Sequence, residues 1–185
     1  MTDGTCLKHQ FLLAMPGLAA DYFGNTITYV CEHNEDGAMG LMINRPTDLS
    51  VSDLLTQLGI ESSLDLPACV VEGGPVLNDR GFILHTEDSR FETSLALGNG
   101  LMLSTARQTL QAIASGEGPE KYLIALGYAG WAGGQLEAEL TQNAWLTCPA
   151  NLDVLFEVPF AQRVDRAAAT LGIDFRLMSR QAGHA

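Results

Sequence analysis

The succession of short, strand-like segments is the feature that most constrains the fold of this chain. Apolar residues alternate with polar ones or form short runs between turn-forming residues, and strand candidates outnumber helix candidates by about two to one. They follow one another in hairpin-like runs, as where Glu35-Asp36-Gly37 separates residues 26–33 from residues 38–43. A doubly wound parallel sheet needs alternating strands and helices instead. The sequence therefore predicts an α/β protein of the α+β type, with a mixed, largely antiparallel sheet that curls on itself.

The remaining elements are predicted from the same patterns. A helix at residues 49–58 begins with a capping-box-like pair, Ser50 and Asp53, and ends at Gly59. Further helices are expected around residues 106–114, 136–140 and 160–171. Further strands are expected at residues 11–15, 68–72, 81–86, 93–97, 101–103, 121–127, 144–148 and 154–157.

Length and composition are typical of one globular domain. The 185 residues suit a single domain spanning residues 1–185, with residues 1–9 and 179–185 expected to be frayed. No apolar run approaches the roughly 20 residues that span a bilayer, and residues 1–10 hold no apolar signal-peptide core. The four cysteines lie far apart without a CxxC pair, which disfavours a disulfide scaffold. We therefore expect a cytoplasmic protein that does not enter a membrane.

The charge balance disfavours direct binding to nucleic acid. The chain carries 22 acidic and 10 basic residues, a formal net charge of −12, and such a field repels phosphate backbones. Asp165 and Asp174 interrupt the basic residues near the C-terminus, which are Arg163, Arg166, Arg176 and Arg180. A protein or a small molecule is therefore the expected kind of partner.

Cys31 and His33 form the first candidate site. In a regular strand these two side chains share one face, while Glu32 points to the other. A protonated His33 would lower the pKa of the Cys31 thiol and favour the reactive thiolate. The alternative is that Cys31 is a small buried apolar residue. A metal site would need His85 to join them, which spacing cannot establish, so no metal and no cofactor is predicted.

Two glycine-containing segments form the second and third candidates. Residues 127–134 resemble an anion-binding loop between a strand and a helix, but they match no phosphate-binding pattern, and close packing around Trp131 is the alternative. Glu72-Gly73-Gly74-Pro75 stands with Arg45 and Arg80, whose guanidinium groups could bind a carboxylate or pair internally. Hydrolase motifs are missing, and Ser104 and Ser115 have no recognisable base nearby in sequence, although a triad of distant residues stays possible.

Several motifs in one order resemble the YqgE/AlgH family of bacterial proteins. The resemblance covers residues 11 to 174, and it departs from the family pattern at Ala20-Asp21 and at Val164. The carrying segments are FLLAMPGL (11–18), CEHNEDGAMGLMINRP (31–46), EGGPV (72–76), RGFILH (80–85), GYAGWAGGQLEAEL (127–140) and NAWL (143–146).

The resemblance implies a flattened pseudo-barrel with peripheral helices. Family members carry the label of transcriptional regulator, without an established reaction or ligand. It also implies a shared cleft lined by Cys31, Glu32, His33, Asn44, Arg45, Gly73, Gly74, His85, Trp131 and Gln135.

Three functions stay open on the sequence. The first is a regulator that acts through a protein or small-molecule partner. The second is an enzyme or redox-responsive protein that uses Cys31 and His33 as catalytic residues. The third is a structural or assembly module with an inert cleft.

Overall fold

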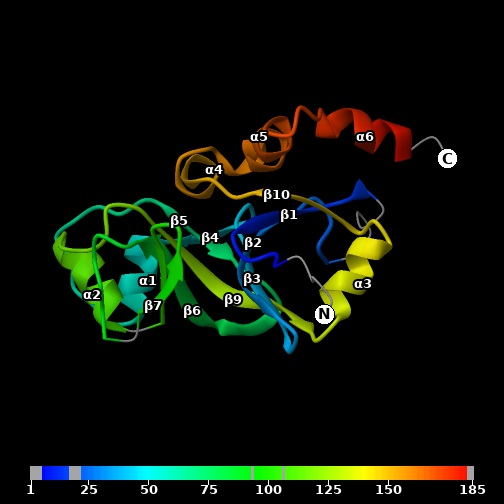
Figure 1. Cartoon of the computed structure of the whole chain (residues 1–185). Helices are drawn as coiled ribbons and strands as arrows, with labels where there is room; N and C mark the ends of the chain where they lie inside the picture. The colour runs from blue at the N-terminus through cyan, green and yellow to red at the C-terminus, as the bar shows by residue number, and fades with distance from the viewer. Residues whose placement is uncertain (1–5, 17–21, 93, 106, 183–185) are drawn as a thin grey trace. The chain divides into compact units, whose positions relative to one another are not determined.

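Strand β9 (Tyr122–Ala132) belongs to both of the compact units that the chain forms in the computed structural model (Figure 1). Unit 1 comprises residues 1–44 and 129–185, and unit 2 comprises residues 45–128. The structure describes residues 6–16, 22–92, 94–105 and 107–182, so the predicted frayed ends fall partly outside the described residues. A single domain over residues 1–185 stays a prediction.

Unit 1 is an antiparallel sheet with the strand order β10-β1-β2-β3-β9. The predicted hairpin between β2 and β3 is confirmed, with Glu35 and Asp36 in its loop, and a bulge interrupts its register at Cys31. Trp131 and Trp145 pack in a core on this sheet with Leu12, Val30 and other apolar residues. The elements are β1 (Gln10–Ala14), β2 (Ile27–Asn34), β3 (Gly37–Met42), α3 (Gln135–Thr141), β10 (Trp145–Pro149), α4 (Leu152–Phe156), η2 (Phe160–Gln162), α5 (Arg163–Ala169) and α6 (Phe175–Ala182).

A buried arginine fastens the C-terminal helices of unit 1 to its sheet. The Arg163 side chain donates to the carbonyl of Ile43 at 2.6 Å and to that of Val158 at 2.8 Å. Its guanidinium lies 4.4 Å from the ring centre of Phe160, and burial lowers its pKa to about 10. Because Arg163 is 4 % exposed, it cannot serve a basic surface patch.

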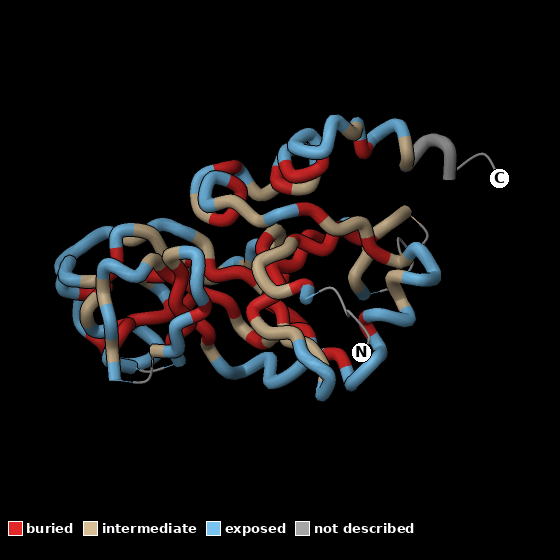
Figure 2. The backbone as a smooth tube through the Cα atoms, in the orientation of Figure 1, coloured by how far each residue is buried: buried red, intermediate tan, exposed pale blue. Residues whose placement is uncertain are grey.

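Unit 2 surrounds a second core between strands and two helices. β9 pairs antiparallel with β6 and parallel with β5, β6 continues to β8 and β7, and β4 pairs with β5. Figure 2 shows buried segments within this unit; β8 and the second half of β6 are buried, and α1 and α2 add Leu54, Leu55, Leu110 and Ile113 to the core. The elements are β4 (Pro46–Ser50), α1 (Val51–Gln57), β5 (Cys69–Glu72), β6 (Val76–Thr86), β7 (Leu95–Gly98), β8 (Leu101–Ser104) and α2 (Arg107–Ser115).

The predicted fold class is confirmed: the protein is α+β, with a mixed, largely antiparallel, curled sheet and a few helices. The capping box of α1 is present, with Ser50 and Asp53 each bonded to the other's backbone. Two local predictions are wrong. Residues 154–157 lie in helix α4 and its C-cap instead of a strand, and residues 127–132 continue β9 instead of forming a loop. Helix α6, which follows the last predicted helix, is an element that the sequence patterns do not predict.

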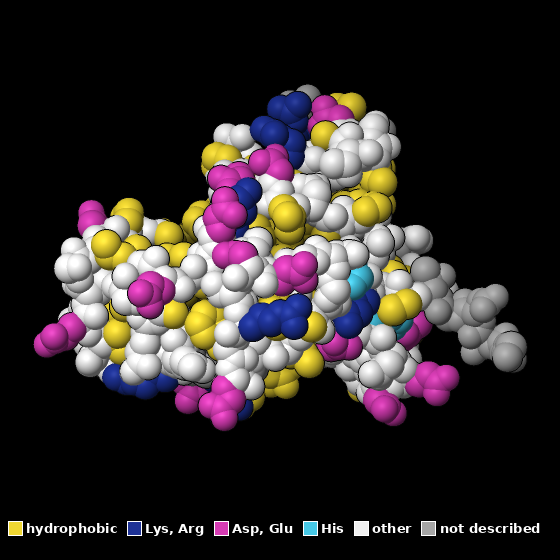
Figure 3. All heavy atoms as spheres, turned by 60° about the vertical axis from the view of Figure 1, so that its left-hand side comes forward, with side chains coloured by type: hydrophobic (Ala, Val, Ile, Leu, Met, Phe, Trp, Pro, Cys, Tyr) yellow, Lys and Arg dark blue, Asp and Glu magenta, His cyan; other side chains and the backbone are white. Residues whose placement is uncertain are grey.

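Two surface observations bear on partners. Within the described residues, no helix has the length and apolar character needed to cross a membrane. On the face shown in Figure 3, acidic side chains are scattered and basic side chains form small, separate clusters.

Gly127 tests the packing around β9 in unit 2. Its φ is +77°, and a Cβ there would lie 2.3 Å from the Gly74 carbonyl oxygen. Gly134 has almost the same φ, +79°, but open space around its Cβ position. We expect Gly134→Ala to lower the free energy of unfolding by about 1 kcal/mol and Gly127→Ala by about 3 kcal/mol or more, because only the latter adds a clash to the backbone strain. Chemical denaturation of both variants measures this difference, and equal losses would contradict it.

Candidate functional site

A pocket in unit 2 combines an apolar floor with two arginines at its edge. Its volume is about 230 Å³, which is below the range of sites for drug-sized ligands. We call it the arginine pocket; its lining comes from α1, β6, the start of α2 and β9, and consists of Leu54, Leu58, Asp79, Arg80, Gly81, Ile83, Thr105, Arg107, Leu110, Ile124 and Leu126.

The floor of the arginine pocket is part of the core of unit 2. Ile83 on β6 and Ile124 on β9 are register partners, so their side chains lie on the same face of the sheet. Leu54 from α1 and Leu110 from α2 pack against them in the same core. All four residues are buried, with exposed fractions of 9 % or less. The floor is thus apolar and held in place by secondary structure.

The edge of the pocket is polar and carries a local excess of positive charge. Arg80 ends the exposed first half of β6, and Arg107 is the first residue of α2. Thr105 and Asp79 complete the edge, and all four of these residues are exposed. Within the described part of the chain, neither guanidinium takes part in an ion pair. Two arginines against one aspartate favour an anionic ligand, although the chain as a whole carries −12.

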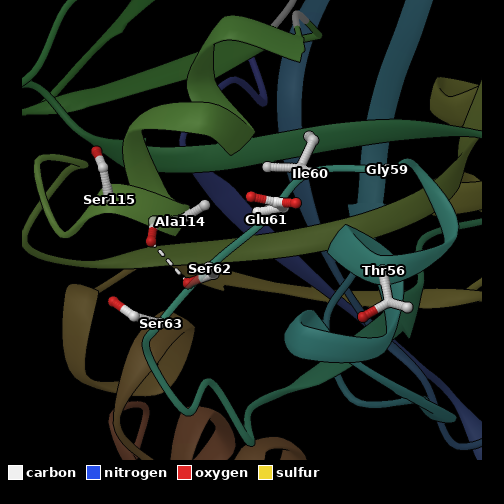
Figure 4. Close-up of a pocket in the computed structure, with 8 residues that line it drawn as sticks. All are labelled: Thr56, Gly59, Ile60, Glu61, Ser62, Ser63, Ala114 and Ser115. Carbon is white, nitrogen blue, oxygen red and sulfur yellow. Dashed lines mark hydrogen bonds between the residues drawn. The ribbon is translucent and has the colours of Figure 1, made fainter.

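A larger hollow in unit 2, about 760 Å³, is a weaker candidate. Thr56, residues 59–63, Ala114 and Ser115 surround it from α1, the following connection and the end of α2 (Figure 4). The Ser62 hydroxyl donates to the Ala114 carbonyl at 2.6 Å, and those of Thr56 and Ser115 also donate to carbonyls of their own helices. Because these protons already have acceptors, the hydroxyls are less available to a ligand.

In unit 1, His33 ties the N-terminal segment and helix α3 to strand β2. Its Nδ1 accepts a hydrogen bond from the Leu7 backbone N–H at 2.9 Å. The proton of the neutral ring is therefore on Nε2, which pairs with the Glu137 carboxylate. A backbone N–H bond and this histidine lower the pKa of Glu137. Both ring nitrogens are thus occupied by contacts that organise the fold.

The Cys31 thiol is buried in the core of unit 1. It is 0 % exposed, and its Sγ lies 3.9 Å from the Tyr29 carbonyl oxygen. Burial, assisted by the nearby Glu32 charge, raises the pKa of Cys31 to about 12. The proposed catalytic pair needs a lowered pKa, so the electrostatics favour the alternative, a small buried apolar residue.

The other predicted cleft residues of unit 1 also make internal contacts. Glu32 pairs with Lys8 at 3.1 Å. The Asn44 side chain accepts from Ile27 N–H and donates to the Asn25 carbonyl. Trp131 is buried and its indole N–H donates to Glu139 at 2.9 Å, while the Gln135 side chain accepts from the Ala132 N–H. His33 and Trp131 thus each bond to a glutamate of helix α3, whereas Asn44 bonds to residues elsewhere in the unit.

In unit 2, the predicted cleft residues have different neighbours. Gly73 and Gly74 both approach the Gly127 backbone closely, and the Arg45 carbonyl accepts from the Glu72 N–H at 2.8 Å. His85 is fully buried on β6, bonded to Ser104. A cleft shared by all ten predicted residues draws on both units and stays a prediction.

Sequence reasoning identified one of the two pocket arginines. Arg80 is a carboxylate-binding candidate on the sequence, together with Arg45, whereas the sequence analysis does not select Arg107. Its signal is its position at the beginning of a helix whose Leu110 is apolar and faces the core. Among the described residues, no group of three or more His, Cys, Asp and Glu side chains could hold a metal ion.

Alkylation at pH 8 tests the assignment of Cys31. We expect iodoacetamide to modify the exposed Cys6 at least about 100-fold faster than Cys31, because a thiol with a pKa of about 12 is almost fully protonated and the solvent cannot reach it. Peptide mass spectrometry measures each rate, and denaturant should make the rates similar. Rapid modification of Cys31 that His33→Ala abolishes would restore the catalytic pair.

Comparisons with known proteins place the chain in a family. The family model described as AlgH-like (DUF179) matches residues 11–176. The UPF0301 protein AlgH of Pseudomonas aeruginosa is 52% identical over 185 residues, covering 98% of this chain and 97% of that protein. A UPF0301 protein of Thioalkalivibrio sulfidiphilus is 50% identical over 188 residues, covering 100% of both chains.

Solved structures agree with this. The solution structure of AlgH from Pseudomonas aeruginosa matches with a TM-score of 0.78 at 50% identity, covering 100% of this chain and 99% of that chain. A crystal structure of a Corynebacterium diphtheriae protein has a TM-score of 0.74 at 19% identity, covering 97% and 94%, and it supports the fold alone. The chain therefore belongs to the AlgH-like family, whose members include the UPF0301 proteins.

Proposed function

We propose that this protein is a binding protein for a small carboxylate with a short apolar tail, which it takes up in the arginine pocket. The single observation that carries the proposal is the position of Arg80 and Arg107 beside a buried apolar floor. A carboxylate accepts parallel hydrogen bonds from a guanidinium, and the floor offers burial to an alkyl tail.

The size of the pocket sets the ligand class. A volume of about 230 Å³ suits a short alkyl chain better than a nucleotide or another drug-sized molecule. Leu58, at the rim, is 40 % exposed, so a bound tail would also cover apolar surface that is now in contact with water. Both contributions favour an amphipathic ligand over a free inorganic anion.

In this proposal, regulation passes through the ligand or a protein partner rather than through direct contact with DNA. The net charge of −12 opposes approach to a phosphate backbone, and the burial of Arg163 removes one of the four C-terminal arginines from any basic surface. The role of transcriptional regulator and a cytoplasmic location stay part of the proposal.

Titration calorimetry with straight-chain carboxylates, from acetate to octanoate, tests the binding function. We expect affinity to rise by up to about fourfold for each added CH₂ until the tail fills the pocket, because each buried CH₂ contributes about 0.8 kcal/mol. Arg107→Gln and Arg80→Gln should each weaken binding by about tenfold or more, since each removes a charge-assisted hydrogen bond.

Two controls separate the pocket from general charge. Arg90→Gln removes an exposed arginine of unit 2 that does not line the pocket, and it should leave affinity unchanged. 1-Octanol, which lacks the carboxylate, should bind more weakly than octanoate. The proposal fails if no member of the series binds, or if both pocket variants bind like the unmodified protein.

Direct binding to DNA is the competing form of regulation. At 150 mM salt we expect fluorescence anisotropy with a mixed-sequence duplex to give a Kd above ~100 μM, because the chain has few phosphate contacts to offer and strong net repulsion. A gel shift with sequence preference at this salt concentration would show that the protein contacts DNA itself.

A further inference from the structure

A chain of two hydrogen bonds in unit 2 leads from a buried histidine through a buried serine to a half-buried serine. The ring of His85 on β6 bonds through Nε2 to the Ser104 hydroxyl on β8 at 2.7 Å. The Ser104 oxygen lies 2.7 Å from that of Ser94, just before β7. His85 and Ser104 are 0 % exposed, and Ser94 is half-buried, so the chain ends where solvent begins.

The contacts at the two ends fix the direction of every proton in this chain. His85 Nδ1 lies 2.8 Å from the Thr86 carbonyl oxygen, which can only accept, so Nδ1 carries the proton and Nε2 is an acceptor. Ser104 must then donate to Nε2, and its oxygen is left to accept from the Ser94 hydroxyl. Ser94 in turn accepts from the Phe91 backbone N–H at 3.0 Å. The Ser94 hydroxyl thus donates to Ser104, which in turn donates to the base His85, and the Ser94 oxygen accepts a hydrogen bond from the Phe91 N–H.

The surroundings of His85 suit a base at neutral pH. Burial lowers the pKa of His85, which keeps the imidazole in its neutral, proton-accepting form. The Asp88 carboxylate favours the charged form of the ring, and it is held in place by the Thr86 hydroxyl and by the Glu120 backbone N–H at 2.9 Å. The Thr86 carbonyl orients the ring through Nδ1, and the exposed Asp88 adds a smaller electrostatic attraction for the protonated ring. This is the arrangement of a nucleophile and an oriented base, with Ser104 inserted as a relay.

We propose that Ser94 is an acylation site, with a nucleophilic hydroxyl that His85 deprotonates through Ser104. The substrates are acyl donors whose leaving group departs as a stable anion, such as aryl esters and acyl phosphates. The Ser94 oxygen forms a bond to the acyl carbon while the bond from that carbon to the leaving oxygen breaks. The Ser94 proton moves to Ser104, the Ser104 proton moves to His85 Nε2, and the leaving group departs with the electron pair.

Covalent labelling with an uncharged alkyl fluorophosphonate tests this site. Here the Ser94 oxygen bonds to phosphorus and fluoride leaves, so the reagent reports on the same hydroxyl. We expect peptide mass spectrometry to find the label on Ser94 and not on Ser62, whose hydroxyl donates to a carbonyl. Ser94→Ala should abolish labelling. Ser104→Ala should slow it about 100-fold, the size of effect typical of lost general-base assistance.

The controls separate reactivity from folding and from the carboxylate site. His85→Gln removes the base and is compared with Ser104→Ala, with thermal unfolding confirming that each variant is folded. Ser62→Ala should label like the unmodified protein. The inference is overturned if Ser94 is not labelled faster than Ser62, or if folded Ser104→Ala labels at the original rate. Arg90→Gln, which changes an exposed arginine of unit 2 that does not line the arginine pocket, should also label like the unmodified protein. Labelling is read on Ser94 with an uncharged reagent, whereas carboxylate affinity is read by calorimetry, so failure of carboxylate binding and failure of this inference are distinguishable.

Discussion

The close approach of two backbone segments at Gly127 is the constraint on which the packing of unit 2 depends. Strand β9 pairs there with β5 on one side and β6 on the other, and the carbonyls of Gly74 and Val76 lie within 3.0 Å of the position a Gly127 Cβ would occupy. Gly73 makes a matching approach to the Gly127 carbonyl. Gly73 and Gly74, which the family resemblance implies for a cleft, thus lie with Gly127 where two backbone segments pack closely. Beyond a register shift between Val76 and Gly81, the pairing of β6 with β9 continues, and there Ile83 and Ile124 are partners and line the floor of the arginine pocket.

Desolvation decides which polar residues organise the fold and which remain free for chemistry. The buried Arg163 side chain loses its contacts with water, and two hydrogen bonds to carbonyl groups and a contact with Phe160 replace them. His33 uses both ring nitrogens on Leu7 and Glu137, and Cys31 is withdrawn from solvent altogether. In contrast, Arg80 and Arg107 stay exposed beside an apolar surface, so their hydrogen-bonding capacity remains available to a ligand.

Local sequence patterns predicted the helices and strands better than they predicted the residues of the candidate site. The capping box at Ser50 and the β2–β3 hairpin depend on neighbouring residues, which are visible in the sequence. The sequence predicts a strand at residues 154–157, but Asn151 caps a helix that covers most of these residues. The site depends on which strands pair. Ser104 seemed to lack a base because His85 is distant in sequence, and only the antiparallel register of β6 and β8 brings them together.

That same register relates the two proposed activities of unit 2. Ile124, Ile83 and Ser104 are successive partners across β9, β6 and β8, and directly paired residues lie on one face of a sheet. The Ser104 hydroxyl extends this row to Ser94. This row of side chains begins with Ile124 and Ile83, which form part of the floor of the arginine pocket, and continues with the hydroxyl groups of Ser104 and Ser94. Ile124, Ile83 and Ser104 are themselves buried, so a ligand can reach this row only at its two ends, the exposed arginines and the half-buried Ser94. Carboxylate binding and acylation are therefore separate chemistries at opposite ends of one row, and each can be measured without the other.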